Sequence, residues 1–190
     1  MEAPVSGSKG PAHAGQLIFL CAGSESIFGD ETVQSSLKAM GKATHFFGKV
    51  VGFGTRAKLV VNSLMGTMMT AFGESLALAE SVGLDGSKML EVFGQGVCNS
   101  PLYTLKGPKM LAKDHAPNFP LQHAHKDMKL ACDMAKDAGV EYSVTESAEQ
   151  LFQKARADKE LNVAEEDFSA VFESIHKESK SDFSKKRRLE

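Results

Sequence analysis

The stretch Gly52–Asn62, GFGTRAKLVVN, opens a long helical pattern and has two interpretations. Its first six residues fit the loose dinucleotide fingerprint G-x-G-x-x-[GA], which predicts a loop that holds a cofactor pyrophosphate. That interpretation requires a strand before the loop, a second strand after the helix and an acidic residue about 20 positions on. The candidate acid, Glu74, lies inside the helical pattern with no strand nearby. The sequence therefore favours a helix start over a nucleotide loop.

The apolar residues that follow this stretch recur at three- and four-residue spacing, which predicts one long helix over residues 55–82. They are Ala57, Val61, Leu64, Met68, Phe72, Leu76 and Ala79. At a rise of 1.5 Å per residue, roughly 28 residues span about 42 Å, which is more than a small domain needs for itself. We expect such a helix to pack against several others or against a second subunit.

Shorter helical patterns continue along the chain after this helix. They cover residues 87–93, 101–112, 121–138, 146–157 and 168–177. The residues Ser143-Val144-Thr145-Glu146 fit a capping box, Asp167 fits an N-cap, and Gly139 is placed to close the helix before it. Residues 51–178 are therefore predicted to form an all-α helical bundle.

The first 50 residues have α/β character. Residues 16–22, QLIFLCA, form the continuous apolar run typical of a strand buried on both faces, and residues 43–47 predict a second strand. Between them, residues 32–40 predict a short helix capped by Asp30. These elements bury too little surface for a complete doubly wound sheet, so we expect only a sheet remnant, in a segment cut out of something larger. The predicted fold class is mainly α, with this remnant before the bundle.

Composition limits the classes of function. The chain has 190 residues, 42% of them hydrophobic, and a formal net charge of −2, which suits one or two globular units and gives no sign of a nucleic-acid partner. No apolar run approaches the roughly 18 residues of a membrane span, and the N-terminus has no signal-peptide pattern. We expect a cytoplasmic protein, with organellar targeting left open, and a disordered polar tail over residues 179–190, where KKRR is a solvated charge run rather than a nuclear signal.

Cysteine and histidine spacing predicts no metal site. The three cysteines are far apart and odd in number, which excludes a disulfide framework and a C-x-x-C half-site. His123 and His125 lie two residues apart on a predicted helix, so they point to different faces, unlike the i, i+4 pair of a helical zinc motif. Cys98 lies in a predicted loop without a matched histidine, so we expect no catalytic role for it.

Two polar groups have both a structural and a functional interpretation. Lys58 and Asn62 lie four residues apart at the start of the long helix and project from one face, where spacing alone favours a solvated stripe. Ser6-Gly7-Ser8 reads by itself as a polar turn. Alternatively, a protonated lysine can stabilise a developing oxyanion, and a glycine-containing turn with serine hydroxyls can bind a carboxylate.

Four separated motifs together resemble the β-hydroxyacid dehydrogenase family, in particular its plant-type glyoxylate and succinic semialdehyde reductases. They are EAPVSGSKGPAHAGQLIFLCAG at 2–23, GFGTRAKLVVNSLMG at 52–66, FPLQHAHKDMKLA at 119–131 and DFSAVFE at 167–173. The resemblance runs from Glu2 to about Ile175. It implies a Rossmann domain followed by an all-α domain like the C-terminal part of 6-phosphogluconate dehydrogenase.

The resemblance also implies site residues. Lys58 matches the family's catalytic lysine in G-x-G-x-x-x-K-x-x-x-N, and Asn62 matches the asparagine that orients it or holds substrate. Ser6, Gly7 and Ser8 match the carboxylate-binding turn.

In the second part, Lys126 matches the K-D lysine that closes over the nicotinamide end of the cofactor. Asp127 and Phe119 match residues of the substrate cleft.

Two functions follow as expectations from this resemblance. The first is an oxidoreductase that uses NADPH or NADH to reduce a small aldehyde or 2-oxo acid, such as glyoxylate or succinic semialdehyde, and that forms a homodimer or higher homo-oligomer. The chain begins after the family's nucleotide loop, so the isolated fragment is expected to be inactive. The second is a non-catalytic helical dimerisation module derived from the same family.

Overall fold

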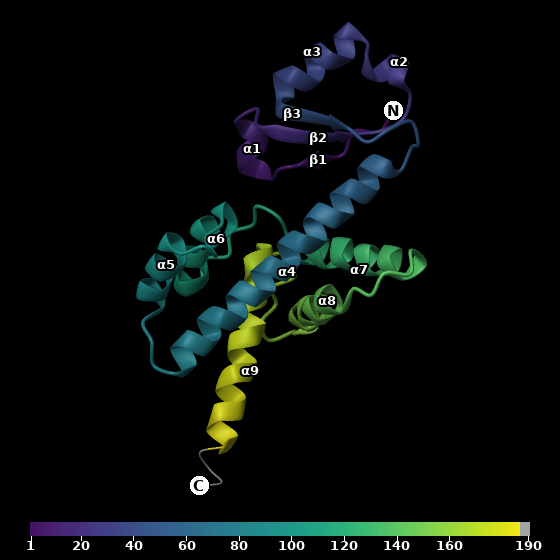
Figure 1. The fold of residues 1–190 in the computed structure, drawn as a ribbon. Coiled ribbons are helices and arrows are strands. Elements are labelled where there is room, and N and C mark those ends of the chain that lie inside the picture. Colours follow the sequence, from purple (N-terminus) through teal and green to yellow (C-terminus); the bar gives the residue numbers. More distant parts are fainter. Residues whose placement is uncertain (187–190) are drawn as a thin grey trace. The chain divides into compact units, whose positions relative to one another are not determined.

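The computed structural model describes residues 1–186 and contains two compact units, divided between Leu64 and Met65 inside the long helix. The first unit is built on a three-stranded sheet in the order β1 (Val5–Ser6), β2 (Leu17–Cys21) and β3 (Gly41–Phe46) (Figure 1). Strand β1 pairs antiparallel with β2, and β2 pairs parallel with β3. The parallel pair is connected through helices, as a Rossmann-type crossover requires.

Three helices accompany the sheet. They are α1 (Lys9–His13), α2 (Glu25–Phe28) and α3 (Glu31–Met40). Asp30 caps α3, because its carboxylate accepts hydrogen bonds from the backbone N–H groups of Thr32 and Val33 at 2.9 and 3.2 Å. The core of this unit contains Phe19, Cys21 and Leu37. The two strands and the helix expected within residues 16–47 are thus present within a residue or two of their predicted bounds.

The first residues, EAPVSGS, look strand-like in the sequence, but local patterning set no bounds for β1 and did not indicate α1 or α2. The first residues pair with the sheet, since Val5 lies opposite Phe19, and the backbones of Glu2 and Ala22 exchange hydrogen bonds of 2.9 and 3.1 Å. Two-residue strands and four- or five-residue helices are too short to establish a hydrophobic period, which explains why local patterning missed them.

Helix α4 (Phe53–Ser81) is a continuous helix of 29 residues that begins in the first unit and continues in the second. The other helices of the second unit are α5 (Gly86–Gln95), α6 (Pro101–Ala112), α7 (Leu121–Asp137), α8 (Ser143–Ala157) and α9 (Val171–Lys186), with the short 3-10 helix η1 at Phe168–Ala170. Within this unit α5 packs against α6 and α7 against α8, and Figure 1 shows α4 passing between the two pairs. The mainly α class predicted from the sequence is confirmed.

The core of the second unit lies where these helices meet. Its fully buried side chains include Met69 and Leu76 of α4, Met128 of α7, Phe152 of α8 and Phe172 of α9. Of the apolar positions that predicted the helical period, Phe72 and Leu76 lie in this core, whereas Val61 and Leu64 are exposed. Gly66 allows α4 to approach α7 closely, because a Cβ atom there would lie 2.3 Å from the sulfur of Met128.

Two sequence predictions for this unit were wrong. Helix α8 begins at Ser143, three residues before the predicted start, and no side chain caps it: the first turn closes between the Glu146 N–H and the Tyr142 carbonyl at 3.0 Å. The capping box fails because Ser143 is already helical. Helix α9 continues through Lys186, so residues 179–186 are helical rather than disordered, which is possible because no Gly or Pro interrupts them. Residues 187–190, with the second half of KKRR, lie outside the described residues.

Candidate active site

The start of α4 is fixed by the side chain of Glu2. One carboxylate oxygen accepts hydrogen bonds from the N–H groups of Gly52 and Gly54 at 2.6 and 2.8 Å, and the other accepts from the Thr55 hydroxyl at 2.6 Å. The Thr55 hydrogen bond, together with the N–H groups of Gly52 and Gly54, holds the pKa of Glu2 below its usual value, although partial burial opposes this. A carboxylate of the chain itself therefore occupies the anion-favouring end of the helix.

This arrangement argues against the dinucleotide loop. In such a loop, the N–H groups of the glycines face the pyrophosphate, but here those of Gly52 and Gly54 donate to Glu2. Within residues 1–186, α4 is followed only by helices and never by a second parallel strand. The second glycine has a packing role, because a Cβ atom on Gly54 would lie 2.1 Å from the carbonyl oxygen of Leu20 in β2. The GFGT segment thus joins helix to sheet and does not fit a pyrophosphate.

Lys58 lies next to the serine-glycine turn. Its ammonium group donates a hydrogen bond of 2.5 Å to the carbonyl oxygen of Val5, the residue before Ser6. Ser6 ends β1, Gly7 has a φ of +137°, and Ser8 precedes α1. The positive φ explains the glycine, because L side chains rarely adopt this conformation.

Asn62 lies one helical turn beyond Lys58 on α4 and is buried, with 5% of its surface exposed. Buried polar side chains of this kind are fixed by hydrogen bonds, which suits an orienting role. Lys58, Asn62 and the Ser6–Ser8 turn all belong to the first unit, where the structure brings Lys58 to the start of the turn.

The remaining predicted site residues belong to the second unit. The ammonium group of Lys126, on α7, is 3.0 Å from a carboxylate oxygen of Asp127, and the lysine side chain is 60% exposed whereas the aspartate is 9% exposed. Phe119 precedes α7, and its ring meets that of Phe168 edge to face at 5.7 Å between centroids. An exposed lysine beside a largely buried carboxylate fits the binding of an anionic part of a cofactor.

A buried ion pair supports the segment that carries Phe119. The Lys106 ammonium group lies 2.7 and 2.8 Å from the two carboxylate oxygens of Asp167, and both side chains are nearly inaccessible. Asp167 also accepts hydrogen bonds from the N–H groups of Asn118, Phe119 and Ser169 at 3.1, 3.3 and 3.1 Å. Burial raises the pKa of Asp167, but the Lys106 hydrogen bonds and charge outweigh it, so the net pKa is below its usual value.

Sequence reasoning did not find the two sets of contacts that hold the site residues in place, the Lys106–Asp167 ion pair and the hydrogen bonds of Glu2. Asp167 was identified only as a helix cap, and Lys106 carried no local signal, because its partner lies 61 residues away. Glu2 was quoted only as part of a motif, and its partners lie 50 to 53 residues along the chain.

His115 and His125 each lie within hydrogen-bonding distance of a carboxylate and of one further polar side chain. His123 is exposed and His125 buried, so they lie on different faces of α7 as predicted. His125 is 2.8 Å from a carboxylate oxygen of Glu149 and 3.2 Å from the guanidinium of Arg156. An arginine can only donate, so Nδ1 of His125 accepts and its Nε2–H donates to Glu149. His115 similarly lies between Ser169 and Glu173, and residues 1–186 contain no group of three or more metal-type ligands.

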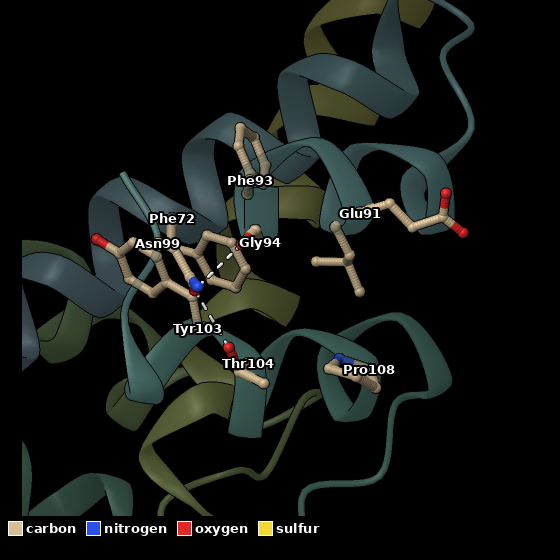
Figure 2. A pocket seen from close by; sticks show the side chains of 9 residues that line it. Phe72, Glu91, Phe93, Gly94, Asn99, Tyr103, Thr104 and Pro108 are labelled. Carbon is tan, nitrogen blue, oxygen red and sulfur yellow. Dashed lines mark hydrogen bonds between the residues drawn. The ribbon is translucent and has the colours of Figure 1, made fainter. Parts of the chain in front are cut away.

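An apolar hollow of about 230 Å³ lies between α4, α5 and α6 (Figure 2). The ring of Tyr103 stacks on that of Phe72 with 4.3 Å between centroids. At the rim, the Asn99 amide donates to the Gly94 carbonyl at 2.9 Å and accepts from the Thr104 hydroxyl at 3.2 Å, as the dashed lines in Figure 2 show. None of the predicted site residues lines this hollow.

Two sequence families together match nearly the whole of the described chain. The family described as "NAD-binding of NADP-dependent 3-hydroxyisobutyrate dehydrogenase" matches residues 52–175, and that described as "NAD binding domain of 6-phosphogluconate dehydrogenase" matches residues 1–52. The chain belongs to the β-hydroxyacid dehydrogenase family. Lys58 lies near the start of the longer of these two matches, which begins at residue 52. None of the helices within residues 1–186 has the length and apolar character needed to cross a membrane.

Several curated proteins are similar to most of the chain. Glyoxylate/succinic semialdehyde reductase 2, chloroplastic, of Arabidopsis thaliana is 44% identical over 175 residues, which is 92% of this chain and 47% of the relative. Glyoxylate/succinic semialdehyde reductase 1 of the same plant is 41% identical over 92% of this chain and 58% of the relative. The cytokine-like nuclear factor N-PAC of Drosophila melanogaster is 31% identical over 90% of this chain and 28% of that protein. The chain thus spans about half the length of the two Arabidopsis relatives.

Solved structures of the family share the fold. The 3-hydroxyisobutyrate dehydrogenase of Salmonella typhimurium matches with a TM-score of 0.81 at 26% identity, over 90% of this chain and 58% of that one.

Proposed function

We propose that the chain is the lysine-bearing, helical part of an NAD(P)-dependent reductase that converts a small aldehyde or 2-oxo acid, of the glyoxylate or succinic semialdehyde type, to the hydroxy acid. The observation that carries this proposal is the ammonium group of Lys58, hydrogen-bonded to Val5 at the start of the Ser6–Ser8 turn. The names of the two Arabidopsis relatives support the substrate class. In this proposal residues 1–50 belong to the Rossmann domain and residues 51–178 to the catalytic and dimerisation domain.

The chemistry of the turn and the lysine is complementary. A reduced nicotinamide cofactor, when bound, supplies the hydride. The Lys58 ammonium group stabilises negative charge that develops on the carbonyl oxygen of the substrate and then donates a proton to it. Ser6, Gly7 and Ser8 bind the substrate carboxylate through backbone N–H groups and hydroxyls. Asn62 orients Lys58 or the substrate.

The proposed roles of Lys126, Asp127 and Phe119, in the second unit, rest on the family resemblance. Lys126 provides positive charge toward the nicotinamide end of the cofactor, whether NADPH or NADH, and Asp127 and Phe119 line the substrate cleft. Support comes from the exposed ammonium group of Lys126 and from the buried Lys106–Asp167 pair, which fixes the backbone of Phe119. We place the protein in the cytoplasm, although one relative is named chloroplastic.

The proposal is tested by restoring a cofactor domain. The segment that precedes the matched region in Arabidopsis reductase 1 is fused to Met1, and NADPH oxidation is measured with glyoxylate and with succinic semialdehyde. Lys58→Met keeps most of the apolar volume but removes the charge and the transferable proton, so turnover should fall by about two to four orders of magnitude. The KM for NADPH should barely change.

Lys42→Met is the matched control for this variant. Lys42 is an exposed lysine of β3, and its replacement should leave turnover unchanged. A fusion that binds NADPH but reduces neither substrate would refute the reductase proposal. Near-normal turnover in Lys58→Met would refute the role of the lysine.

A second candidate function is a non-catalytic association module, which an exposed stripe on α4 favours. Side chains at alternating three- and four-residue spacing lie on its surface, with Leu64 58% and Leu78 64% exposed. The complete stripe is Val61, Leu64, the half-buried Met68, Ala71, the polar Ser75 and Leu78. The similarity to N-PAC, whose name describes a nuclear factor, is compatible with this alternative.

The same stripe supports a homodimer or higher homo-oligomer under either function, because an exposed apolar seam of this length is stabilised by a partner helix. An active fusion whose turnover depends on Lys58 would favour the reductase over the module.

A further inference from the structure

Glu2 is the group that connects the N-terminal edge of the sheet to the start of the helix that bears Lys58. Its backbone is held by the pair of hydrogen bonds with Ala22, directly after β2. Its side chain reaches across to α4 and accepts three hydrogen bonds, from Gly52, Gly54 and Thr55. A single residue is therefore fixed to the sheet at one end and to the helix at the other.

A second contact joins the same two segments. Three residues after Glu2, Val5 accepts from the Lys58 ammonium group, and three residues before Lys58, Thr55 donates to Glu2. Residues three apart on a helix lie on neighbouring positions of one face, so Thr55 and Lys58 both face the 2–5 segment. The Glu2 contact and the Lys58 contact thus fix the same helix face against the same strand.

We propose that Glu2 is a positioning residue for Lys58: its carboxylate holds the first turn of α4 against the strand, so that the ammonium group reaches the start of the Ser6–Ser8 turn. The catalytic part of this inference rests on the proposed reductase function. Glu2 itself contacts no substrate in this scheme.

A carboxylate suits this place better than a neutral acceptor. The three donors converge on one side chain at the N-terminus of a 29-residue helix, where the helix dipole favours negative charge. Glu2→Gln has nearly the same shape, and its amide oxygen can still accept from Gly52 and Gly54, but its NH2 group replaces the oxygen that accepts from the Thr55 hydroxyl, and the negative charge is lost. Hydrogen bonds to an ionised acceptor are also about twice as strong as neutral ones. The substitution therefore loosens the start of α4 without removing a core side chain.

The first experiment uses the chain itself and does not depend on activity. In the ¹⁵N-labelled chain with ¹³C-labelled lysine, the amide protons of Gly52 and Gly54 should move upfield in Glu2→Gln, and the Cε signal of Lys58 should shift with them. Glu25→Gln is the matched control, because Glu25 pairs with Lys49 at an exposed site of the same unit. It should leave all three signals in place.

The second experiment uses the active fusion. Glu2→Gln should lower kcat about 10- to 100-fold, because a displacement of the order of 1 Å at a catalytic group can cost about 10²-fold. The KM for NADPH and the melting temperature should change little. Thr55→Ser keeps the hydroxyl donor and should behave as the wild type, whereas Thr55→Val should show part of the Glu2→Gln loss.

The outcomes separate this inference from the proposed function. Unchanged Lys58 Cε signals in Glu2→Gln would overturn the positioning role, whether or not the fusion is active. Shifted signals with an inactive wild-type fusion would retain the positioning of Lys58 and refute the reductase function. Shifted signals with unchanged kcat in Glu2→Gln would show that the position of Lys58 does not limit turnover, which overturns the catalytic part.

Discussion

Replacing Asp167 by asparagine should destabilise the second unit more than most single substitutions in the chain. Asp167 is the only carboxylate found within reach of the Lys106 ammonium group among residues 1–186, and the side chains of the pair are 2% and 3% exposed. The asparagine side chain is nearly the same size as that of aspartate, so no cavity forms and packing is preserved. The variant instead leaves the Lys106 charge buried without its counter-ion.

The expected cost follows from these contacts. Breaking a buried ion pair by removing one partner costs about 3–5 kcal/mol of unfolding free energy, because the remaining charge is uncompensated. The single amide oxygen of asparagine can accept either from the N–H groups of Asn118 and Phe119, which approach Oδ2, or from that of Ser169, which approaches Oδ1, so the variant also loses backbone hydrogen bonds and should lie toward the upper end of that range. At roughly 2–4 °C per kcal/mol for a chain of this size, the melting temperature should fall by about 6–20 °C.

Urea unfolding followed by circular dichroism measures this cost. Asp133→Asn is the control, since the exposed Lys129–Asp133 pair on α7 should contribute less than about 1 kcal/mol. The pKa of Asp167 is lowered in the folded state, so its contribution is complete above the unfolded pKa and is lost as pH falls through the folded one. The difference between wild type and variant should therefore be constant above about pH 5 and shrink in more acidic solution.

A second substitution decides whether the uncompensated charge is the cause. Adding Lys106→Met to Asp167→Asn removes the buried charge and should restore part of the lost stability, although two residues are then altered. A double variant less stable than Asp167→Asn alone would refute the reasoning.

Three further outcomes can be measured on the same chain. Gly54→Ala should lower the unfolding free energy by about 1–3 kcal/mol in urea melts, because its Cβ atom would meet a carbonyl oxygen of β2 at 2.1 Å. Gly94→Ala is the control: its Cβ atom would meet nothing within 4 Å, so it should be neutral or stabilising. Equal effects of the two substitutions would contradict the packing argument. Burial raises the pKa of the Cys132 thiol to about 11, so iodoacetamide at pH 8 should label the exposed Cys98 first. Mass spectrometry measures the order of labelling, and faster labelling of Cys132 would contradict its burial. Leu78→Glu in the exposed stripe of α4 should shift sedimentation toward the monomer, and an unaltered oligomer would exclude this stripe as the interface.

Local periodicity predicted the longer helices and the central strand of this protein. The three- and four-residue spacing from Ala57 to Ala79 placed α4 within two residues of its bounds, and the QLIFLCA run placed β2 within one. These predictions succeeded because a helix or strand that buries one face must repeat its apolar residues with its own period. Caps such as Asp30 were identified for the same reason, since a cap and its partners lie within one turn.

Motif resemblance provided the candidate site residues. At the start of α4, however, the sequence alone gave only indirect evidence against a nucleotide loop. The sequence opposed the nucleotide-loop interpretation of GFGTRA only through missing strands. The structure adds the direct reason, that Glu2 accepts the hydrogen bonds of both glycines.

Tertiary structure alone decided the contacts that hold the site residues in place. Glu2 with α4, Lys58 with Val5 and Lys106 with Asp167 each join residues 50 or more positions apart. A glutamate near a chain end, or a lysine before Gly-Pro, looks like an ordinary surface residue in sequence, because nothing local marks its partner. These charges acquire their roles only when the chain folds, since burial removes water and makes each unpaired polar group costly enough to require a specific partner.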